Sequence, residues 1–442
     1  MQRALSFDSS PPLSIPLRFI VSTPAFVLLA GILLFWYGPT ALISRWNSSA
    51  LAITHLFTLG VLGNVMAGAL MQILPVATGI HVISAKTTAY VVHVSLCLGS
   101  IILATAFIMF SPVLFGLALV LLAAGMWWFA VAVLFGMWVH RKQATKGSPT
   151  ILMAVRLAVI SLVITVLLGL TLAGSIALEL PLPRQLTDLH ASWGTLGWVG
   201  ILIIGISFQV IPMFQVTELY PKFITRWLAL VIFIILGLTT ANSLVNWSIK
   251  TEVSLLISSA AILAYLVYAA VTFDVLRQRK RPEPDTTTLF WLTSIASLAA
   301  CFPVWLLHIA NVADLSVTLG VLFIIGFAWS AVNGMLYKIL PFLLWYNTQR
   351  KLTIALRSVP KVKHFMPDSY VRPQVYAHWI ALSLLIMASI WPHWLTHLSA
   401  IALCVSALWL MLNMKQALQL YLHAKYAIKR ELKEKESTNP AG

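Results

Sequence analysis

Residues 55–79 read HLFTLGVLGNVMAGALMQILPVATG, and the spacing of their glycines and proline recurs twice further along the chain. The second copy is HASWGTLGWVGILIIGISFQVIP at residues 190–212, and the third is GFAWSAVNGMLYKILP at residues 326–341. In each copy two glycines stand fifteen and seven residues before the proline, and a long polar residue stands three before it. A spacing that recurs in this way indicates an architecture built from similar units.

The composition assigns these units to a membrane. Of the 442 residues, 60% are hydrophobic and only 10% are charged, whereas a soluble domain carries roughly 25% charged residues. A helix needs about 20 apolar residues to cross the hydrocarbon core. Twelve such runs occur, near residues 16–38, 50–75, 88–110, 112–139, 150–177, 190–213, 225–246, 253–276, 287–309, 315–346, 374–395 and 398–422. The sequence therefore predicts an all-α integral membrane protein with about twelve transmembrane helices, and the long polar lead of the first run argues against a cleaved signal peptide.

The basic residues give this topology a direction. The chain has 29 Lys and Arg against 13 Asp and Glu, a net charge of +16. With a cytoplasmic N-terminus, 23 of the 29 fall in cytoplasmic segments, three (Arg45, Arg184 and Lys250) fall in outer segments, and three lie within the spans. Cytoplasmic loops of membrane proteins are enriched in Lys and Arg. We therefore expect both termini in the cytoplasm of a bacterial cell with the chain in its inner membrane, and we expect no nucleic-acid partner.

The repeat divides the chain into three units of four helices. The units are predicted at residues 1–148, 149–282 and 283–424, followed by a cytoplasmic tail at residues 425–442. Because four is even, the three copies of the motif enter the membrane in the same direction. We expect the units to be related by an axis along the membrane normal, unlike inverted-repeat transporters.

The repeated motif has a structural interpretation. Glycine removes side chains where helices cross closely, and proline marks the place where regular helical hydrogen bonding stops. The polar residues Gln72, Gln209 and Lys338 are expected to reach the carbonyls that the prolines leave free.

Histidine is the polar residue in surplus at membrane level, and ionisable groups there are usually retained for function. The predicted topology places His55, His190, His308, His393 and His397 towards the outer side, and His93 and His378 deeper. Imidazole is a common ligand of haem iron and copper. We predict His55, His190, His308, His93 and His378 as candidate cofactor ligands, with His55 and His190 as the candidate metal ligands. The competing interpretation of each is a histidine that packs and forms hydrogen bonds within the bundle.

Two further features of the cysteines bear on the chemistry. The cysteines, Cys97, Cys301 and Cys404, all fall in apolar runs without a CxxC pair, so they indicate neither disulfides nor a zinc or iron–sulfur site. The absence of CxxCH argues against a covalently attached haem. A soft thiolate site is therefore not expected, and imidazole ligation of haem or copper is more plausible than zinc.

The twelve helices and the histidine-led second helix resemble the haem–copper oxidase subunit I superfamily. The local pattern His55, Gly60, Gly68, Pro75, then Thr78-Gly79 is most similar to the NnrS family of haem- and copper-containing membrane proteins linked to nitric oxide response. The resemblance implies that His55 is an axial ligand of a low-spin haem, and that His190 lies on the helix where an oxidase places a copper ligand. The second axial ligand of His55 is left open.

The departures from the oxidase pattern limit what the resemblance implies. Residues 226–247 contain no His-His pair, and residues 326–341 contain no His-x-His. Without these ligands an oxygen-reducing centre is not expected, so the resemblance implies a haem protein that is not a terminal oxidase, and it identifies no catalytic residues. Its expected roles are nitric oxide response, metal or haem handling, or support of respiratory enzymes, with partners of the same respiratory or metal-handling kind.

Two interpretations without a metal stay open. The repeat and the helices rich in glycine and proline also suit a permease for a small solute, although the direction of the repeats and the scarcity of membrane acids argue against one. The basic inner segments, residues 347–373 above all, suit a scaffold that docks an acidic partner subunit or anionic lipid.

Overall fold

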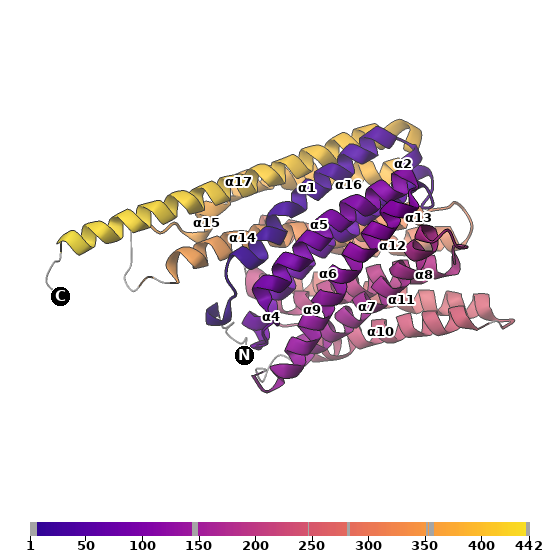
Figure 1. Cartoon of the computed structure of the whole chain (residues 1–442), viewed down its shortest axis with the longest axis horizontal. Coiled ribbons are helices and arrows are strands. Elements are labelled where there is room, and N and C mark those ends of the chain that lie inside the picture. Colours follow the sequence, from indigo (N-terminus) through magenta and orange to yellow (C-terminus); the bar gives the residue numbers. More distant parts are fainter. Residues whose placement is uncertain are drawn as a thin grey trace.

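The computed structural model of the chain describes residues 7–143, 149–245, 247–280, 283–350, 352 and 358–438, with side chains described as far as residue 433. Within these ranges the chain is helical and contains no strand. The long helices lie side by side in one bundle (Figure 1). The predicted all-α polytopic fold is confirmed. Some of the basic residues counted above lie outside this description: Arg3, Lys146, Arg281, Lys351, Arg357 and the side chain of Lys435.

The first third of the chain forms a short 3₁₀ turn, six α-helices and a π-helical segment. They are η1 (Phe7–Ser9), α1 (Ser14–Tyr37), α2 (Thr40–Ile43), α3 (Ser48–His55), the π segment η2 (Leu56–Gly63), α4 (Asn64–Thr78), α5 (Ala85–Met109) and α6 (Pro112–Val139), followed by the 3₁₀ turn η3 (Arg141–Gln143). Local sequence sets several ends. Ser111 accepts a hydrogen bond from the Leu114 amide at the start of α6, and Gly79 ends α4 with a left-handed φ of 75°.

The other two thirds follow the same plan. The second contains α7 (Pro149–Ala177), α8 (Gln185–Ser192), the π segment η4 (Trp193–Ile201), α9 (Leu202–Gln215), α10 (Lys222–Leu244) and α11 (Lys250–Arg277). The third contains α12 (Thr286–Ile309), α13 (Ser316–Gly320), the π segment η5 (Val321–Trp329), α14 (Ser330–Gln349), α15 (Val362–Phe365), α16 (Asp368–Ala388) and α17 (Pro392–Thr438). In each third the second long helix is therefore a composite of α, π and α segments.

Among the described residues, eleven helices are long and apolar enough to cross a membrane. The run expected at 374–395 is the exception, because its helix, α16, begins at Asp368 and includes Arg372 and Gln374 in its first turns. This helix still packs along α17 and against α12 and η5. Helix α17 continues without a break from the last predicted span into the predicted tail, as far as Thr438.

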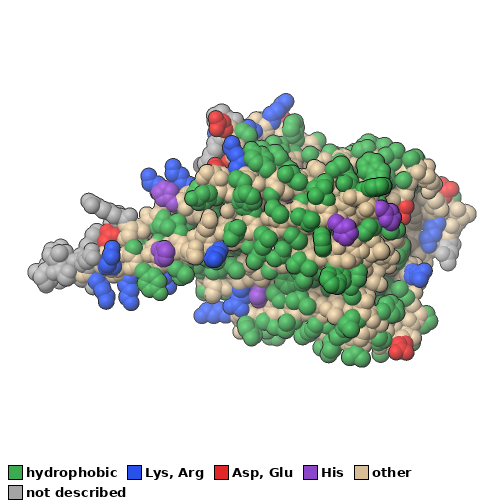
Figure 2. Space-filling view, turned by 90° about the horizontal axis from the view of Figure 1, so that it is seen from above, with side chains coloured by type: hydrophobic (Ala, Val, Ile, Leu, Met, Phe, Trp, Pro, Cys, Tyr) green, Lys and Arg blue, Asp and Glu red, His purple; other side chains and the backbone are tan. Residues whose placement is uncertain are grey.

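The two ends of the bundle differ in charge. The start of α1 and the end of α17 lie at the same end, which we call the proximal end, and α17 extends beyond the bundle there (Figure 1). Hydrophobic side chains cover the bundle on the face seen in Figure 2, and Lys and Arg gather towards the proximal end. An apolar surface of this extent suits the hydrocarbon of a bilayer. The opposite end, with α2, α8 and α13, is called the distal end.

The three π segments occupy the same place in the three motif helices. η2 begins nineteen residues before Pro75, η4 nineteen before Pro212 and η5 twenty before Pro341. A π turn loosens the backbone hydrogen bonding, and π segments are frequent at functional sites. Side chains bind a carbonyl in each segment. Asn64 Nδ2 donates to Gly60 O (2.9 Å), Tyr265 Oη to Leu196 O (2.6 Å) and Ser294 Oγ to Phe327 O (2.9 Å).

The six motif glycines are the places where each motif helix contacts the long helix before it. A Cβ atom added at any of them would lie within 3.0 Å of a side-chain atom of that helix. The glycine–neighbour pairs are Gly60–Phe26, Gly68–Phe19, Gly197–Ser161, Gly205–Ala154, Gly326–Ser297 and Gly334–Phe290. In all three pairs of helices the two neighbours are seven residues apart, and the two glycines are eight residues apart. The predicted role of these glycines in close helix crossing is confirmed.

Two of the polar residues that stand three before the proline have side-chain partners instead of the expected backbone carbonyls. Lys338 Nζ forms an ion pair with Asp285 Oδ2 at 2.7 Å, and Gln72 Nε2 lies 3.5 Å from Ser10 Oγ. Asp285 also caps α12, because its carboxylate accepts the Thr288 amide at 2.9 Å. Burial raises the pKa of the Asp285 carboxyl, but the charge and hydrogen bond of Lys338 together with the Thr288 hydrogen bonds outweigh burial and leave this pKa below its usual value.

Candidate functional site: a histidine pair and a distal cavity

Two of the predicted ligands, His55 and His190, come together in the distal half of the bundle. His55 is the last residue of α3 and directly precedes η2, and His190 lies in α8, three residues before η4. Their ring centroids are 6.2 Å apart and their planes differ by 18°. The two rings belong to different thirds of the chain, so the tertiary fold creates this pair.

A backbone carbonyl holds each ring through the same nitrogen. His55 Nδ1 donates to Leu51 O at 2.8 Å, and His190 Nδ1 donates to Thr165 O at 3.0 Å. A neutral imidazole that donates from Nδ1 carries its lone pair on Nε2. Anchoring one ring nitrogen to a carbonyl is also the usual arrangement of a histidine that ligates a metal with the other.

The surroundings leave room for the rings and fix their position. A Cβ atom on Gly169 of α7 would lie 2.9 Å from His190 Cε1, so a glycine is required beside this ring. Phe107 packs on His55 with ring centroids 5.0 Å apart. Trp193 and Trp198 of η4 are both buried, and Trp198 lines the same cavity as the two histidines.

Both histidines line a cavity of about 1320 Å³ that extends through the distal half of the bundle. Most of its wall is aliphatic or aromatic, for example Phe107, Leu162 and Leu196. The charged residues on its wall all belong to connections or first helical turns at the distal end: Arg45, Arg184, Asp188 and Lys250. A cavity of this size and lining accommodates a large apolar ligand.

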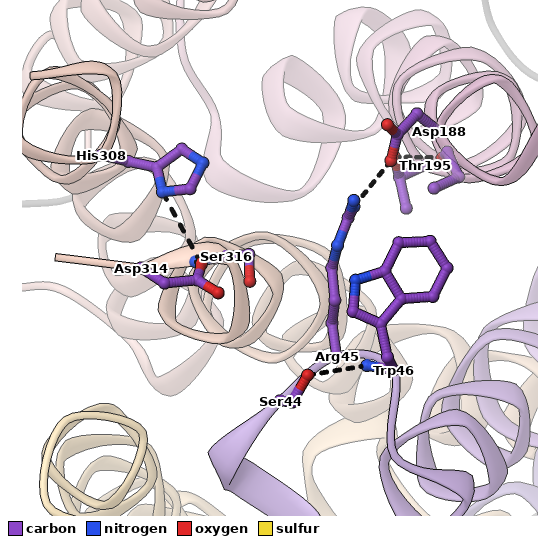
Figure 3. Close-up of polar contacts among 9 residues, drawn as sticks. Ser44, Arg45, Trp46, Asp188, Thr195, His308, Asp314 and Ser316 are labelled. Atoms are coloured by element: carbon purple, nitrogen blue, oxygen red, sulfur yellow. Dashed lines mark hydrogen bonds and ion pairs between the residues drawn. The ribbon is translucent and has the colours of Figure 1, made fainter. Parts of the chain in front are cut away.

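A second cavity of about 610 Å³, the vestibule, adjoins the first at the distal end. Figure 3 shows its polar wall. Arg45 Nη1 donates to Asp188 Oδ1 at 2.7 Å, and the Arg45 guanidinium lies 4.7 Å from the centre of the Trp46 ring. On the opposite side His308 Nδ1 accepts the Leu315 amide at 3.3 Å and lies 3.8 Å from Asp314 Oδ1. Hydrogen bonds from Ser316 hold the pKa of the Asp314 carboxyl below its usual value.

The other predicted ligands lie elsewhere and have partners of their own. His93 Nε2 lies 3.1 Å from Ser22 Oγ and 3.5 Å from Cys97 Sγ. His378 is fully buried, with Nε2 2.7 Å from Ser330 Oγ. His308 lines the vestibule, and His397 packs on Phe35. Of the five predicted cofactor ligands, the structure therefore joins only His55 and His190.

The described residues contain no group of three or more His, Cys, Asp or Glu side chains arranged to hold a metal ion. The donor set at the centre of the site is thus two imidazoles. These two neutral nitrogen ligands lie in an apolar wall. They therefore suit a metal whose remaining ligands are part of the bound group itself.

The sequence did not predict the vestibule or the π segments. Arg45 is one of three basic residues placed outside the cytoplasmic segments, and Asp188 is one of the few acids near a span. The unusual placement of these two residues was the signal in the sequence. Their pairing could not be predicted from it, because it requires the contact between the first and second thirds of the chain. No protein-family model matches the chain, and a search of curated proteins finds no relative.

Proposed function

We propose that this protein binds haem inside the membrane, with His55 and His190 as the two axial ligands of the iron. The observation that carries the proposal is the near-parallel pair of imidazoles, each anchored at Nδ1 and each with Nε2 left for a metal. The pair also supplies a candidate for the second axial ligand that the sequence left open.

The two rings are close enough to belong to one site. Their ring centres are 6.2 Å apart and the rings are stacked, with planes that differ by 18°. A haem or a copper ion bound at this site would be held by His55 and His190.

The donor set favours haem over a bare ion. A porphyrin supplies four nitrogens to its iron, so two protein ligands complete the coordination. The aliphatic and aromatic wall of the 1320 Å³ cavity suits the apolar body of such a group. A bound haem supplies one-electron chemistry. The protein's part is to orient both imidazoles through Leu51 and Thr165 and to exclude water from them.

The resemblance to the NnrS family supports a role in nitric oxide response or in respiratory haem and metal handling, in a bacterial inner membrane and without an oxygen-reducing centre. Copper bound by the same two nitrogens is the alternative cofactor. The apolar helices support a bilayer as the immediate surroundings of the chain.

The test is the haem and copper content, with oxidised and reduced absorbance spectra, of detergent-purified protein from a haem-replete host. We expect one haem per chain with a low-spin spectrum, and its loss in His55→Ala and in His190→Ala. His397→Ala, which changes a histidine on the distal side away from the cavity, is the matched control. A folded, colourless and metal-free wild type would contradict the proposal and favour the permease or the scaffold.

A further inference from the structure

The vestibule and the large cavity are continuous. Residues that line both include Arg45, Asp188, Ala191, Thr195 and Ser316. These residues come from all three thirds of the chain and surround the distal end of the motif helices. A path therefore runs from the distal surface, past the ion pair of Arg45 and Asp188, to the two histidines.

The character of the wall changes along this path. At the mouth are one arginine and two acids, Arg45, Asp188 and Asp314, whereas further in the wall is made of side chains such as Leu162, Leu196 and Phe107. Moving a charge from water into such a wall is costly. This free-energy cost is small for a small uncharged solute. The change from charged to apolar side chains along the path therefore favours uncharged solutes over charged ones.

The ion pair at the mouth is suited to opening. The Arg45 and Asp188 side chains are 42% and 68% exposed, and ion pairs with this exposure contribute little to stability because water competes for both partners. Arg45 donates to Asp188 through one terminal nitrogen, and its guanidinium also contacts the Trp46 ring (Figure 3). The contact with Trp46 does not involve Asp188, so the guanidinium keeps a partner when the ion pair separates.

We propose that the vestibule is the entrance through which small uncharged solutes reach the histidine pair from the aqueous phase at the distal end, and that the Arg45–Asp188 ion pair narrows it. The purpose of the route rests on the proposed function, because the route ends at the proposed axial ligands. Its existence is testable without haem.

The experiment measures access to a thiol beyond the mouth. In a background with Cys97→Ala, Cys301→Ala and Cys404→Ala, a reporter is introduced as Thr58→Cys, one turn beyond His55 on the cavity wall. Labelling rates are compared for methyl methanethiosulfonate, which is uncharged, and for its sulfonatoethyl and trimethylammonioethyl analogues, which are charged. Leu196→Cys serves as a second reporter on the same wall, and size-exclusion chromatography with circular dichroism establishes folding of each variant.

The mouth is then blocked or opened. Ala191→Trp adds bulk at a residue that lines both cavities, and Ala310→Trp adds the same bulk at an exposed distal position that lines neither. We expect the uncharged reagent to label the reporter at least tenfold faster than the charged ones. Ala191→Trp should slow that labelling at least tenfold and Ala310→Trp should not, while Asp188→Ala should accelerate it severalfold.

Two results would overturn the entrance. An unchanged rate in Ala191→Trp would mean that the reagent arrives through the bilayer, and equal rates for charged and uncharged reagents would mean an open aqueous channel. If the protein carries no haem but Ala191→Trp still slows the labelling, the haem proposal is wrong and the entrance proposal is supported. The failures of the two proposals are therefore distinguishable.

Discussion

Two pairs of histidines in the bundle occupy different chemical surroundings. His55 and His190 line the distal cavity with stacked rings 6.2 Å apart, and the Nδ1 atom of each is bound to a backbone carbonyl. His93 and His378 lie apart, each with Nε2 next to a serine hydroxyl. Each of these rings also packs on a phenylalanine, Phe19 or Phe290, at the same centroid distance of 5.3 Å.

The second pair follows the repeat. Phe19 and Phe290 are the side chains that contact the motif glycines Gly68 and Gly334, so His93 and His378 stand at matching places in the first and last thirds. Their hydrogen bonds and ring contacts tie neighbouring helices together. The comparison teaches that histidines at matching places in the first and last thirds serve packing. The pair that lines the distal cavity joins residues of two different thirds.

The largest expected effect separates the two pairs directly. His55→Ala and His190→Ala should each reduce bound haem to background, because each removes one of two protein ligands. The double variant His93→Ala, His378→Ala should keep wild-type haem per folded chain. Haem content and the reduced-minus-oxidised spectrum measure both. If the His93→Ala, His378→Ala double variant loses haem while His55→Ala and His190→Ala keep it, the roles assigned to the two pairs are wrong.

A substitution beside the ring tests positioning without removing a ligand. Gly169→Val places a Cβ atom within 2.9 Å of His190 Cε1, so we expect a severalfold loss of haem occupancy or a shifted low-spin spectrum. Gly174→Val, on the same helix, meets only Leu119 Cδ1 at 3.5 Å and should resemble wild type. Equal spectra for the two variants would show that the ring position is unimportant.

The packing histidines should affect stability more than binding. His378→Ala removes the hydrogen bond to Ser330 and the contact with Phe290 inside a fully buried site. We expect it to lower the unfolding free energy by about 1–3 kcal/mol, and His93→Ala, whose ring is half-buried, to lower it less. Thermal unfolding in detergent measures the difference. A larger effect of His93→Ala would contradict this assignment.

The smallest expected effect lies at the proximal end, in the ion pair of Lys338 and Asp285. The pKa of Asp285 is lowered on folding. Its contribution to stability is therefore present above the unfolded pKa of about 3.9 and lost as pH falls through the lower folded value. The advantage of wild type over Lys338→Met, about 1.5–3 kcal/mol near neutral pH, should shrink below about pH 4. Unfolding temperatures from pH 7 to 3 test this, and a pH-independent difference would argue against the pair. Haem content should not change.

Sequence patterning predicted the features that depend on hydropathy and spacing. Such patterns predicted the spans and the helix crossings at Gly68 and Gly334. They also identified His55 and His190 as candidate ligands. The pairing of those histidines does not, because His55 stands twenty residues before its proline and His190 twenty-two. Whether two such rings face each other depends on how the π segments rotate each helix, which residue spacing does not encode. The ion pair of Arg45 with Asp188 likewise emerges only from packing between distant segments.

The most direct test of the account is rescue of the axial position by free imidazole. His190→Gly, with the space beside Gly169 available, should bind haem weakly or lose the low-spin spectrum, and added imidazole should restore that spectrum in a saturable way. His55→Gly should behave in the same manner, and the His378→Gly control should need no imidazole. If both His55→Gly and His190→Gly keep the full low-spin spectrum without imidazole, or the folded wild type carries no haem, the two histidines are not axial ligands and the central claim is wrong.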